Sequence, residues 1–158
     1  MKTVLLSMQP FWKDKIMSGE KIYEYRSRFS KEIVKAYLYV SAPISGISGI
    51  LYLGEPILLT EWREQYKDNM EVVRRIEEYQ KRKNKVVMPV LSYQETNLIN
   101  LQTLGMKLEK FTVPQSFYYL REDMELTKFL EENIVEEGLL QTNDFERINI
   151  NEICRNYR

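Results

Sequence analysis

The sequence predicts a small α+β barrel with peripheral helices. Three observations support this fold class: short segments rich in β-branched and aromatic residues recur along the chain, only two or three helical patterns separate them, and no internal repeat is present. At 158 residues the chain is long enough for one domain with a substantial core. We therefore expect short strands that curl into a barrel, with the helix between the first two strands closing one end.

The opening stretch, residues 7–26, contains the clearest local pattern. Pro10 suits the first turn of a helix, because its missing N–H would be unpaired there in any case. Gly19 fits the left-handed position that ends such a helix. Residues 21–26 (KIYEYR) then alternate as a strand does. One face of the expected helix carries the apolar residues Trp12, Ile16 and Met17.

Further strands and helices follow from periodicity and composition. We expect strands at 3–8, 33–41, 46–52, 57–59, 86–93, 107–112 and 145–150. Helices are expected at 61–83 and 123–133, and 94–105 fits either a short helix or a strand with a turn. Pro89 removes one ladder hydrogen bond, so its strand should lie at an edge or contain a bulge.

These elements predict one main domain with additions. Residues 1–120 form the expected barrel domain, and 61–83 form a helical insertion in it. Residues 121–158 form an acidic helix and a tail that we expect to pack on the same domain.

Composition narrows the chemistry. The sequence contains no histidine, which excludes Ser-His-Asp and Cys-His nucleophiles, and its one cysteine makes a structural zinc site implausible. We therefore expect no metal and no cofactor. Cys154 has no partner for an internal disulfide, which favours a reducing cytoplasm. No apolar run approaches about 18 residues, so no membrane span is expected.

Charge is balanced overall but uneven along the chain. The sequence has 23 basic and 23 acidic residues, yet residues 1–40 contain eight Lys/Arg and four Asp/Glu, whereas 111–158 contain five and ten. A basic first part can hold an anionic ligand. The overall neutrality argues against strong, non-specific binding to duplex nucleic acid.

Lys21, Glu24 and Arg26 are the main candidates for a site, because they follow a tight turn. Glu24 and Arg26 share a strand face and form either a surface ion pair or a pair that recognises phosphate and a base. Lys21 meets Glu24 only if the strand begins later than residue 21. In that case we expect the carboxylate to keep the amine protonated.

Other candidate contacts surround this stretch. Trp12 is either a core residue or a stacking surface for a base. Gln9 and Ser41 lie at the ends of neighbouring expected strands, and Gln115 lies in a later turn. The charged run 81–85 suits a helix C-terminus, which is the simplest explanation for it.

These residues together resemble the ASCH domain, a branch of the PUA-like superfamily. The matching phrases are LSMQP (6–10), KIMSGEK (15–21), YEYR (23–26) and the strand that ends YVSAP (39–43), and FTVPQSF (111–117) is similar to a segment of some bacterial members. The resemblance covers about residues 3–120. It implies a small PUA-like β-barrel with a cleft beside the opening helix.

The resemblance also implies function. ASCH domains are similar to RNA-binding modules, so we expect this chain to bind RNA or a nucleotide-like ligand. One ASCH branch is an amidohydrolase that acts on N4-acetylcytidine and uses a lysine, a threonine and a distant glutamate. Lys21 falls on that lysine, but Glu24 occupies the threonine position. If the chain is an enzyme, Lys21 and Glu24 are the candidate catalytic residues.

Three functions remain open from sequence. The first is a non-catalytic module that binds RNA or a nucleotide. The second is an amidohydrolase on a modified nucleoside. The third is a protein-interaction adaptor that docks through the acidic part, 121–158.

Overall fold

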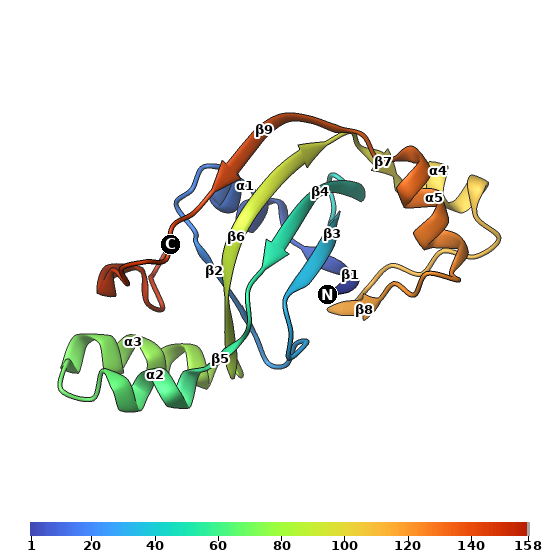
Figure 1. Cartoon of the computed structure of the whole chain (residues 1–158). Helices are drawn as coiled ribbons and strands as arrows, with labels where there is room; N and C mark the ends of the chain where they lie inside the picture. Colours follow the sequence, from blue (N-terminus) through green and yellow to red (C-terminus); the bar gives the residue numbers. More distant parts are fainter. Residues whose placement is uncertain (158) are drawn as a thin grey trace.

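A strongly curved mixed sheet forms the body of the protein (Figure 1). The computed structural model describes residues 1–157. Within them the strands are β1 (Lys2–Met8), β2 (Tyr23–Arg26), β3 (Val34–Val40), β4 (Gly46–Leu53), β5 (Ile57–Leu58), β6 (Val86–Thr96), β7 (Ile99–Asn100), β8 (Phe117–Tyr119) and β9 (Glu136–Thr142). Their main order across the sheet is β2-β6-β4-β3-β1-β8. The curled sheet with peripheral helices confirms the predicted α+β class.

Strand β6 is the hub of the sheet. Its first half pairs with β2 and β5, and its second half pairs with β4 and β9. The expected edge position for this strand is therefore wrong. The alternative of a bulge is confirmed, because the pairing of β4 with β6 shifts register between Ser92 and Val90, next to Pro89. The proline sits where β6 changes partners, so its missing N–H costs little.

The first helix lies as predicted. Helix α1 (Pro10–Met17) begins at its proline and packs Ile16, which is fully buried, into the main core cluster. Trp12 and Met17 pack against the same cluster. Gly19 follows the helix with φ +81°, the left-handed conformation that the sequence predicts for it.

The expected helix over 61–83 is wrong. The chain forms two helices there, α2 (Leu59–Gln65) and α3 (Met70–Lys81). Asn69 separates them, because its side chain accepts a hydrogen bond from the N–H of Val72 and so caps the second helix. The helical spacing of apolar residues continues through the break, so the sequence pattern does not indicate the turn between the two helices.

The second half of the chain differs more from expectation. Residues 94–105 contain the end of β6, then β7 and helix α4 (Leu101–Lys107). Helix α5 (Glu125–Asn133) matches the expected acidic helix. The residues after it were expected only to end the helix, but they form strand β9. No strand forms at 107–112, and 145–150 contains only the start of a 3₁₀ turn (Ile150–Glu152).

Three clusters of buried side chains form the core. The first lies between α1 and the sheet, the second lies under α4 and α5, and the third joins β2 to α2 and α3. In Figure 1 the α2–α3 hairpin and the C-terminal segment lie at one end of the sheet, and α4 and α5 lie at the other. No helix among residues 1–157 has the length and apolar character needed to cross a membrane.

Gly49 is a point where the fold requires glycine. Its φ is +99°, and a Cβ at this position would lie 2.7 Å from the ring and hydroxyl of Tyr93. We expect Gly49→Ala to lower the free energy of unfolding by about 2 kcal/mol, through backbone strain and the clash with the ring. Gly105→Ala is the control: a Cβ meets nothing within 4 Å there, so helix propensity should stabilise by up to about 1 kcal/mol. Urea unfolding measures both, and equal stability of the two variants would contradict this account.

Candidate functional site

A polar cleft of about 450 Å³ lies where the end of β1, strand β2 and the end of α3 meet. Its lining residues are Ser7, Met8, Gln9, Trp12, Glu24, Tyr25, Arg26, Ser27, Arg82, Lys83, Asn84, Gln115 and Ser116. A smaller arm of about 180 Å³ shares five of these residues and adds Lys21 and Tyr79. We call the two parts the cleft and the Lys21 arm.

Lys21 and Glu24 meet because β2 begins at Tyr23 rather than at residue 21. The side chain of Lys21 is therefore free of strict alternation, and its Nζ lies 3.5 Å from Oε2 of Glu24. Both residues are buried, with 4% and 7% of their surface exposed. The Lys21 ammonium also donates to the Tyr23 carbonyl, at 2.5 Å.

Aromatic rings complete the surroundings of Lys21. Its Nζ lies 5.5 Å from the centre of the Trp12 ring and 5.3 Å from that of Tyr25. Such rings stabilise a buried ammonium, but they do not fully compensate for the hydration that it loses on burial. Burial accordingly lowers the pKa of Lys21, although Glu24 acts in the opposite direction and Arg26 adds to the lowering. Desolvation, which the sequence does not reveal, thus has a larger effect on this pKa than the neighbouring carboxylate has.

Arg26 spans the cleft instead of extending freely into it. Its Nη2 donates to the Ser7 carbonyl on β1, at 2.8 Å, and Nη1 lies 3.5 Å from the hydroxyl of Ser116. Its Nε lies 3.4 Å from Oε1 of Glu24 as an ion pair, without the alignment of a hydrogen bond. The predicted pairing of Glu24 with Arg26 is thus present, in a partly buried setting.

The other candidates divide into two groups. Gln9, Trp12 and Gln115 line the cleft together with Glu24 and Arg26. Ser41 does not line the cleft or the Lys21 arm: its N–H donates to the Met8 carbonyl, so it ties the ends of β3 and β1 together. The strand-end argument correctly placed Ser41 beside β1 but did not determine which way its side chain lies.

Sequence reasoning missed the contribution of the α3 end. Arg82, Lys83 and Asn84 line the cleft, although the charged run 81–85 was explained by the helix C-terminus alone. Asn84 donates to the Tyr79 carbonyl and fixes this turn, and the Arg82 guanidinium lies 4.3 Å from the centre of the Tyr79 ring. The signal was the charge run itself, since it is longer than a helix end needs.

The positive character of the cleft has two sources. Lys21 and Arg26 come from the basic first part of the chain, and Arg82 and Lys83 follow directly after α3. Within residues 1–157, Glu24 is the one acid that lines the cleft or the Lys21 arm. Other basic residues of the first part are used elsewhere: Lys13 pairs with Glu95, and Lys15 pairs with Glu20. The excess of positive charge in residues 1–40 therefore accounts for only two of the four cations around the cleft and the Lys21 arm.

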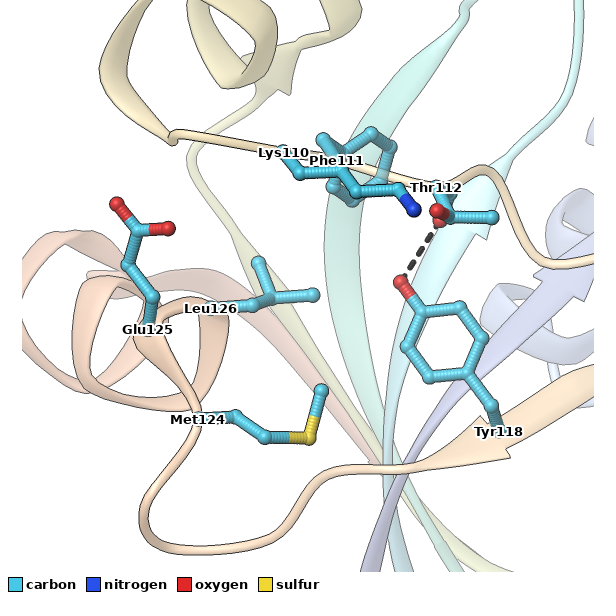
Figure 2. A pocket seen from close by; sticks show the side chains of 7 residues that line it. All are labelled: Lys110, Phe111, Thr112, Tyr118, Met124, Glu125 and Leu126. Atoms are coloured by element: carbon cyan, nitrogen blue, oxygen red, sulfur yellow. Dashed lines mark hydrogen bonds between the residues drawn. The ribbon is translucent and has the colours of Figure 1, made fainter.

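A second cavity of about 400 Å³ lies beside strand β8 and the start of helix α5 (Figure 2). Its walls are largely apolar, with Phe111, Met124 and Leu126, and the Tyr118 hydroxyl donates to the Thr112 carbonyl at its edge. None of the residues predicted for the site lies there. Because the cleft and the Lys21 arm contain the buried ionisable groups, we treat them as the candidate site.

Metal ligands do not gather in the described part of the chain. Among residues 1–157 no three His, Cys, Asp or Glu side chains lie close enough to hold a metal ion. The groups that the candidate site offers are ammonium, guanidinium, carboxylate and amide, together with an indole ring.

Comparison with known proteins places the fold. No family model matches the sequence, and no curated protein matches it. The crystal structure of ASCH from Zymomonas mobilis is similar, with a TM-score of 0.64 and 22% identity over 85% of this chain and 97% of that chain. A tyrosine-to-phenylalanine mutant of the same protein gives 0.63 and 23% over 85% and 100%. The resemblance inferred from sequence is thus confirmed in three dimensions, and the chain has the ASCH-domain fold.

Proposed function

We propose that this protein is an ASCH-family module that binds RNA or a nucleotide-like ligand in the cleft. The observation that carries the proposal is the combination of four cations and one carboxylate around a cavity with an indole wall. Cations bind phosphate, and a carboxylate beside them can accept a hydrogen bond from a base amino group. Because Glu24 is the sole acid among the described residues that line the cleft and the Lys21 arm, the local field of these residues favours an anion.

The parts of the cleft match the parts of a nucleotide. Arg82 and Lys83 at the rim suit phosphate, and Trp12 offers a ring on which a base can stack. Gln9 and Gln115 supply amides for polar contacts with a base or a sugar. Arg26 lines the same space, with its Nη2 committed to the Ser7 carbonyl and its Nη1 near the Ser116 hydroxyl. We propose this set, with Lys21 and Glu24, as the ligand contacts.

Two lysines at the end of α3 give a matched test. Lys83 lines the cleft, whereas Lys81 lies outside it on the same helix end. We expect Lys83→Ala to weaken binding of a labelled single-stranded RNA about tenfold and to reduce its salt dependence by about one counterion, because a phosphate contact is lost. Lys81→Ala should leave both unchanged. Fluorescence anisotropy at several salt concentrations, repeated with a mononucleotide as competitor, measures this.

The same titration can reject the proposal. Equal losses of RNA affinity in Lys83→Ala and Lys81→Ala would mean that the overall positive charge of the protein, and not the cleft, attracts the RNA. Absence of binding of both the RNA and the mononucleotide at low salt would remove the proposed ligand class.

A second function, hydrolysis of an N4-acylated cytidine, is favoured by one observation. Burial lowers the pKa of Lys21, and a neutral amine is a better nucleophile or base than an ammonium. The Lys21 arm also encloses this amine beside a carboxylate. Acetate release from N4-acetylcytidine by the wild-type protein, abolished in Lys21→Met, would establish this reading, and no release above a buffer blank would end it.

We also propose that residues 121–157 belong to the same domain and that the protein acts in the cytoplasm. Strand β9 pairs with β6, and Ile153 and Cys154 lie in the core, which supports a single unit. Burial raises the pKa of the Cys154 thiol to about 12, so it stays protonated and unreactive, as suits a reducing compartment.

A further inference from the structure

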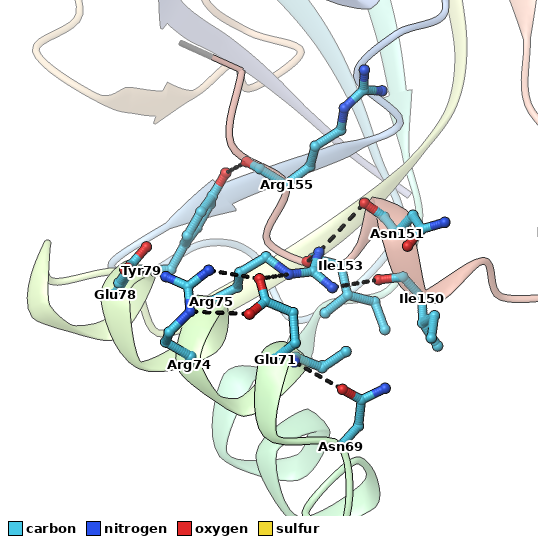
Figure 3. A network of polar contacts seen from close by, with 11 residues as sticks. Asn69, Glu71, Arg74, Arg75, Glu78, Tyr79, Ile150, Asn151, Ile153 and Arg155 are labelled. Carbon is cyan, nitrogen blue, oxygen red and sulfur yellow. Dashed lines mark hydrogen bonds and ion pairs between the residues drawn. The ribbon is translucent and has the colours of Figure 1, made fainter.

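The last residues that the structure describes cross one side of the candidate site. Segment Ile150–Tyr157, called the strap here, follows β9 and runs along helix α3 (Figure 3). Its Ile153 and Cys154 are buried in the third core cluster. The strap is thus anchored in the core on its inner side, while its outer end reaches the Lys21 arm.

Arg75 is the main clasp of the strap (Figure 3). Its guanidinium donates to three backbone carbonyls: Ile150 at 3.1 Å, Asn151 at 3.4 Å and Ile153 at 2.5 Å. An arginine that satisfies three carbonyls fixes a backbone path, because its planar fork holds the donors in a set geometry. Arg74 beside it lacks this role and pairs with Glu71 and Glu78 on the helix surface.

Two tyrosines that border the Lys21 arm hold the next part of the strap. The Tyr79 hydroxyl donates to the Arg155 carbonyl, and the Tyr25 hydroxyl accepts from the N–H of Cys154 at 2.8 Å. Both tyrosines also line the Lys21 arm. Movement of the strap would therefore disturb the walls of the arm directly.

The end of the strap reaches the turn that carries Lys21. Arg155 donates to the Glu20 carbonyl at 3.1 Å, one residue before Lys21. The Tyr157 ring lies edge-on to Trp12, with centres 5.8 Å apart. The Tyr157 hydroxyl is buried and finds no hydrogen-bond partner within residues 1–157. A buried hydroxyl without a partner costs stability, and a polar ligand group beside it would recover that cost.

We propose that the strap determines which ligands reach Lys21, and that Tyr157 is the residue that narrows the way in. This inference rests on the proposed function of the cleft, since it assigns specificity to the same site. The arm measures about 180 Å³, and Trp12, which forms one of its walls, is packed against Tyr157. A planar group the size of a nucleobase enters such a space, and a bulkier one requires the strap to move.

Acetylation of Lys21 tests the strap without any ligand. A water-soluble acetylating reagent is applied to the folded full-length protein, and the rate at Lys21 is measured by peptide mass spectrometry relative to exposed Lys107. We expect Tyr157→Ala to raise the relative rate about tenfold, because it opens the arm. Tyr157→Phe retains the ring and should stay within about twofold of wild type.

The two neighbouring arginines supply the matched control. Arg75→Ala releases the strap at its clasp and should raise the relative rate at Lys21 as Tyr157→Ala does. Arg74→Ala removes the same charge from the same helix and should leave the rate unchanged. If Arg75→Ala fails to fold, the Tyr157 variants still decide the question. An unchanged acetylation rate at Lys21 in Tyr157→Ala would overturn the proposal that the strap controls access to Lys21.

Binding by the same variants separates this inference from the proposed function. We expect Tyr157→Ala to change the affinity for a mononucleotide at least threefold, about 0.7 kcal/mol, while Arg74→Ala does not. Normal binding with no effect of Tyr157→Ala would refute the specificity role alone. If no variant binds the mononucleotide but Tyr157→Ala still speeds acetylation of Lys21, the two proposals separate. The proposed nucleotide ligand would be refuted, and the role of the strap in covering Lys21 would be retained.

Discussion

Glu24→Ala is expected to lower the free energy of unfolding at pH 7 by about 3 kcal/mol, because it leaves a buried ammonium without its carboxylate. Lys21 is 4% exposed, and the Tyr23 carbonyl is the one other acceptor of its ammonium in the part of the chain that the structure describes. Release of a proton from Lys21 limits the loss, since burial already lowers its pKa. Urea unfolding followed by tryptophan fluorescence measures the difference.

A double replacement identifies the cause. Lys21→Met combined with Glu24→Leu removes both charges and keeps apolar volume, so we expect it to lie within about 1 kcal/mol of wild type. Glu64→Ala is the surface control: Glu64 pairs with Lys67 at 3.1 Å, but both side chains are mostly exposed, so little change is expected. If the double variant is less stable than Glu24→Ala, the unpaired ammonium of Lys21 is not the cause of the loss of stability in Glu24→Ala.

The pH dependence of stability follows from the same lysine. Its folded pKa is below the ordinary 10.5, so between the two values the unfolded chain binds more protons than the folded chain. The free energy of unfolding must therefore rise with pH across that window, up to about pH 10.5. Buried tyrosines and Cys154 act with the opposite sign above pH 9. Subtracting the unfolding free energy of Lys21→Met from that of wild type cancels them, and this signed difference should rise with pH up to about 10.5.

Local chemistry explains which parts of this fold the sequence predicts. The first 26 residues follow from Pro10, Gly19 and one apolar helical face, because each of these signals acts within a few positions. Strand β9 shows the opposite case. Its residues Glu136–Thr142 are mostly exposed and carry little apolar alternation, so only the pairing with β6 makes them a strand.

The candidate site shows the same division. Lys21, Glu24 and Arg26 are neighbours in sequence, and their turn indicated a site without a structure. Arg82 and Lys83 arrive through the tertiary packing of α3, and Tyr157 arrives through a strap that is clasped by Arg75. No local pattern encodes such contacts, because they depend on where distant elements pack. Burial is likewise invisible in sequence, and it lowers the pKa of Lys21 against the opposite effect of Glu24.

Arg26→Ala is expected to cost about 3 kcal/mol of unfolding free energy, because charged hydrogen bonds between distant strands are lost together. Strand β2 is at one end of the sheet order, and β1 lies next to the other end. No ladder joins them, but Arg26 on β2 donates to the Ser7 carbonyl on β1 and contacts Ser116 before β8. This single guanidinium therefore ties the open side of the curled sheet beside the cleft.

Arg26→Lys separates charge from shape. An ammonium can keep the ion pair with Glu24 but cannot also span Ser7 and Ser116, so we expect it to recover less than half of the lost stability. Hydrogen exchange should be faster in both variants at the amide of Ser7, which bonds to the Ser116 carbonyl at 2.8 Å, and slower exchange should persist in the ladder of β3 with β4. Uniform acceleration across both regions would mean that Arg26 supports the whole domain and does not act as a local tie. A tie at this point would also couple binding of the proposed ligand to closure of the sheet, because the proposed ligand contact Arg26 is the residue that joins β2 to β1.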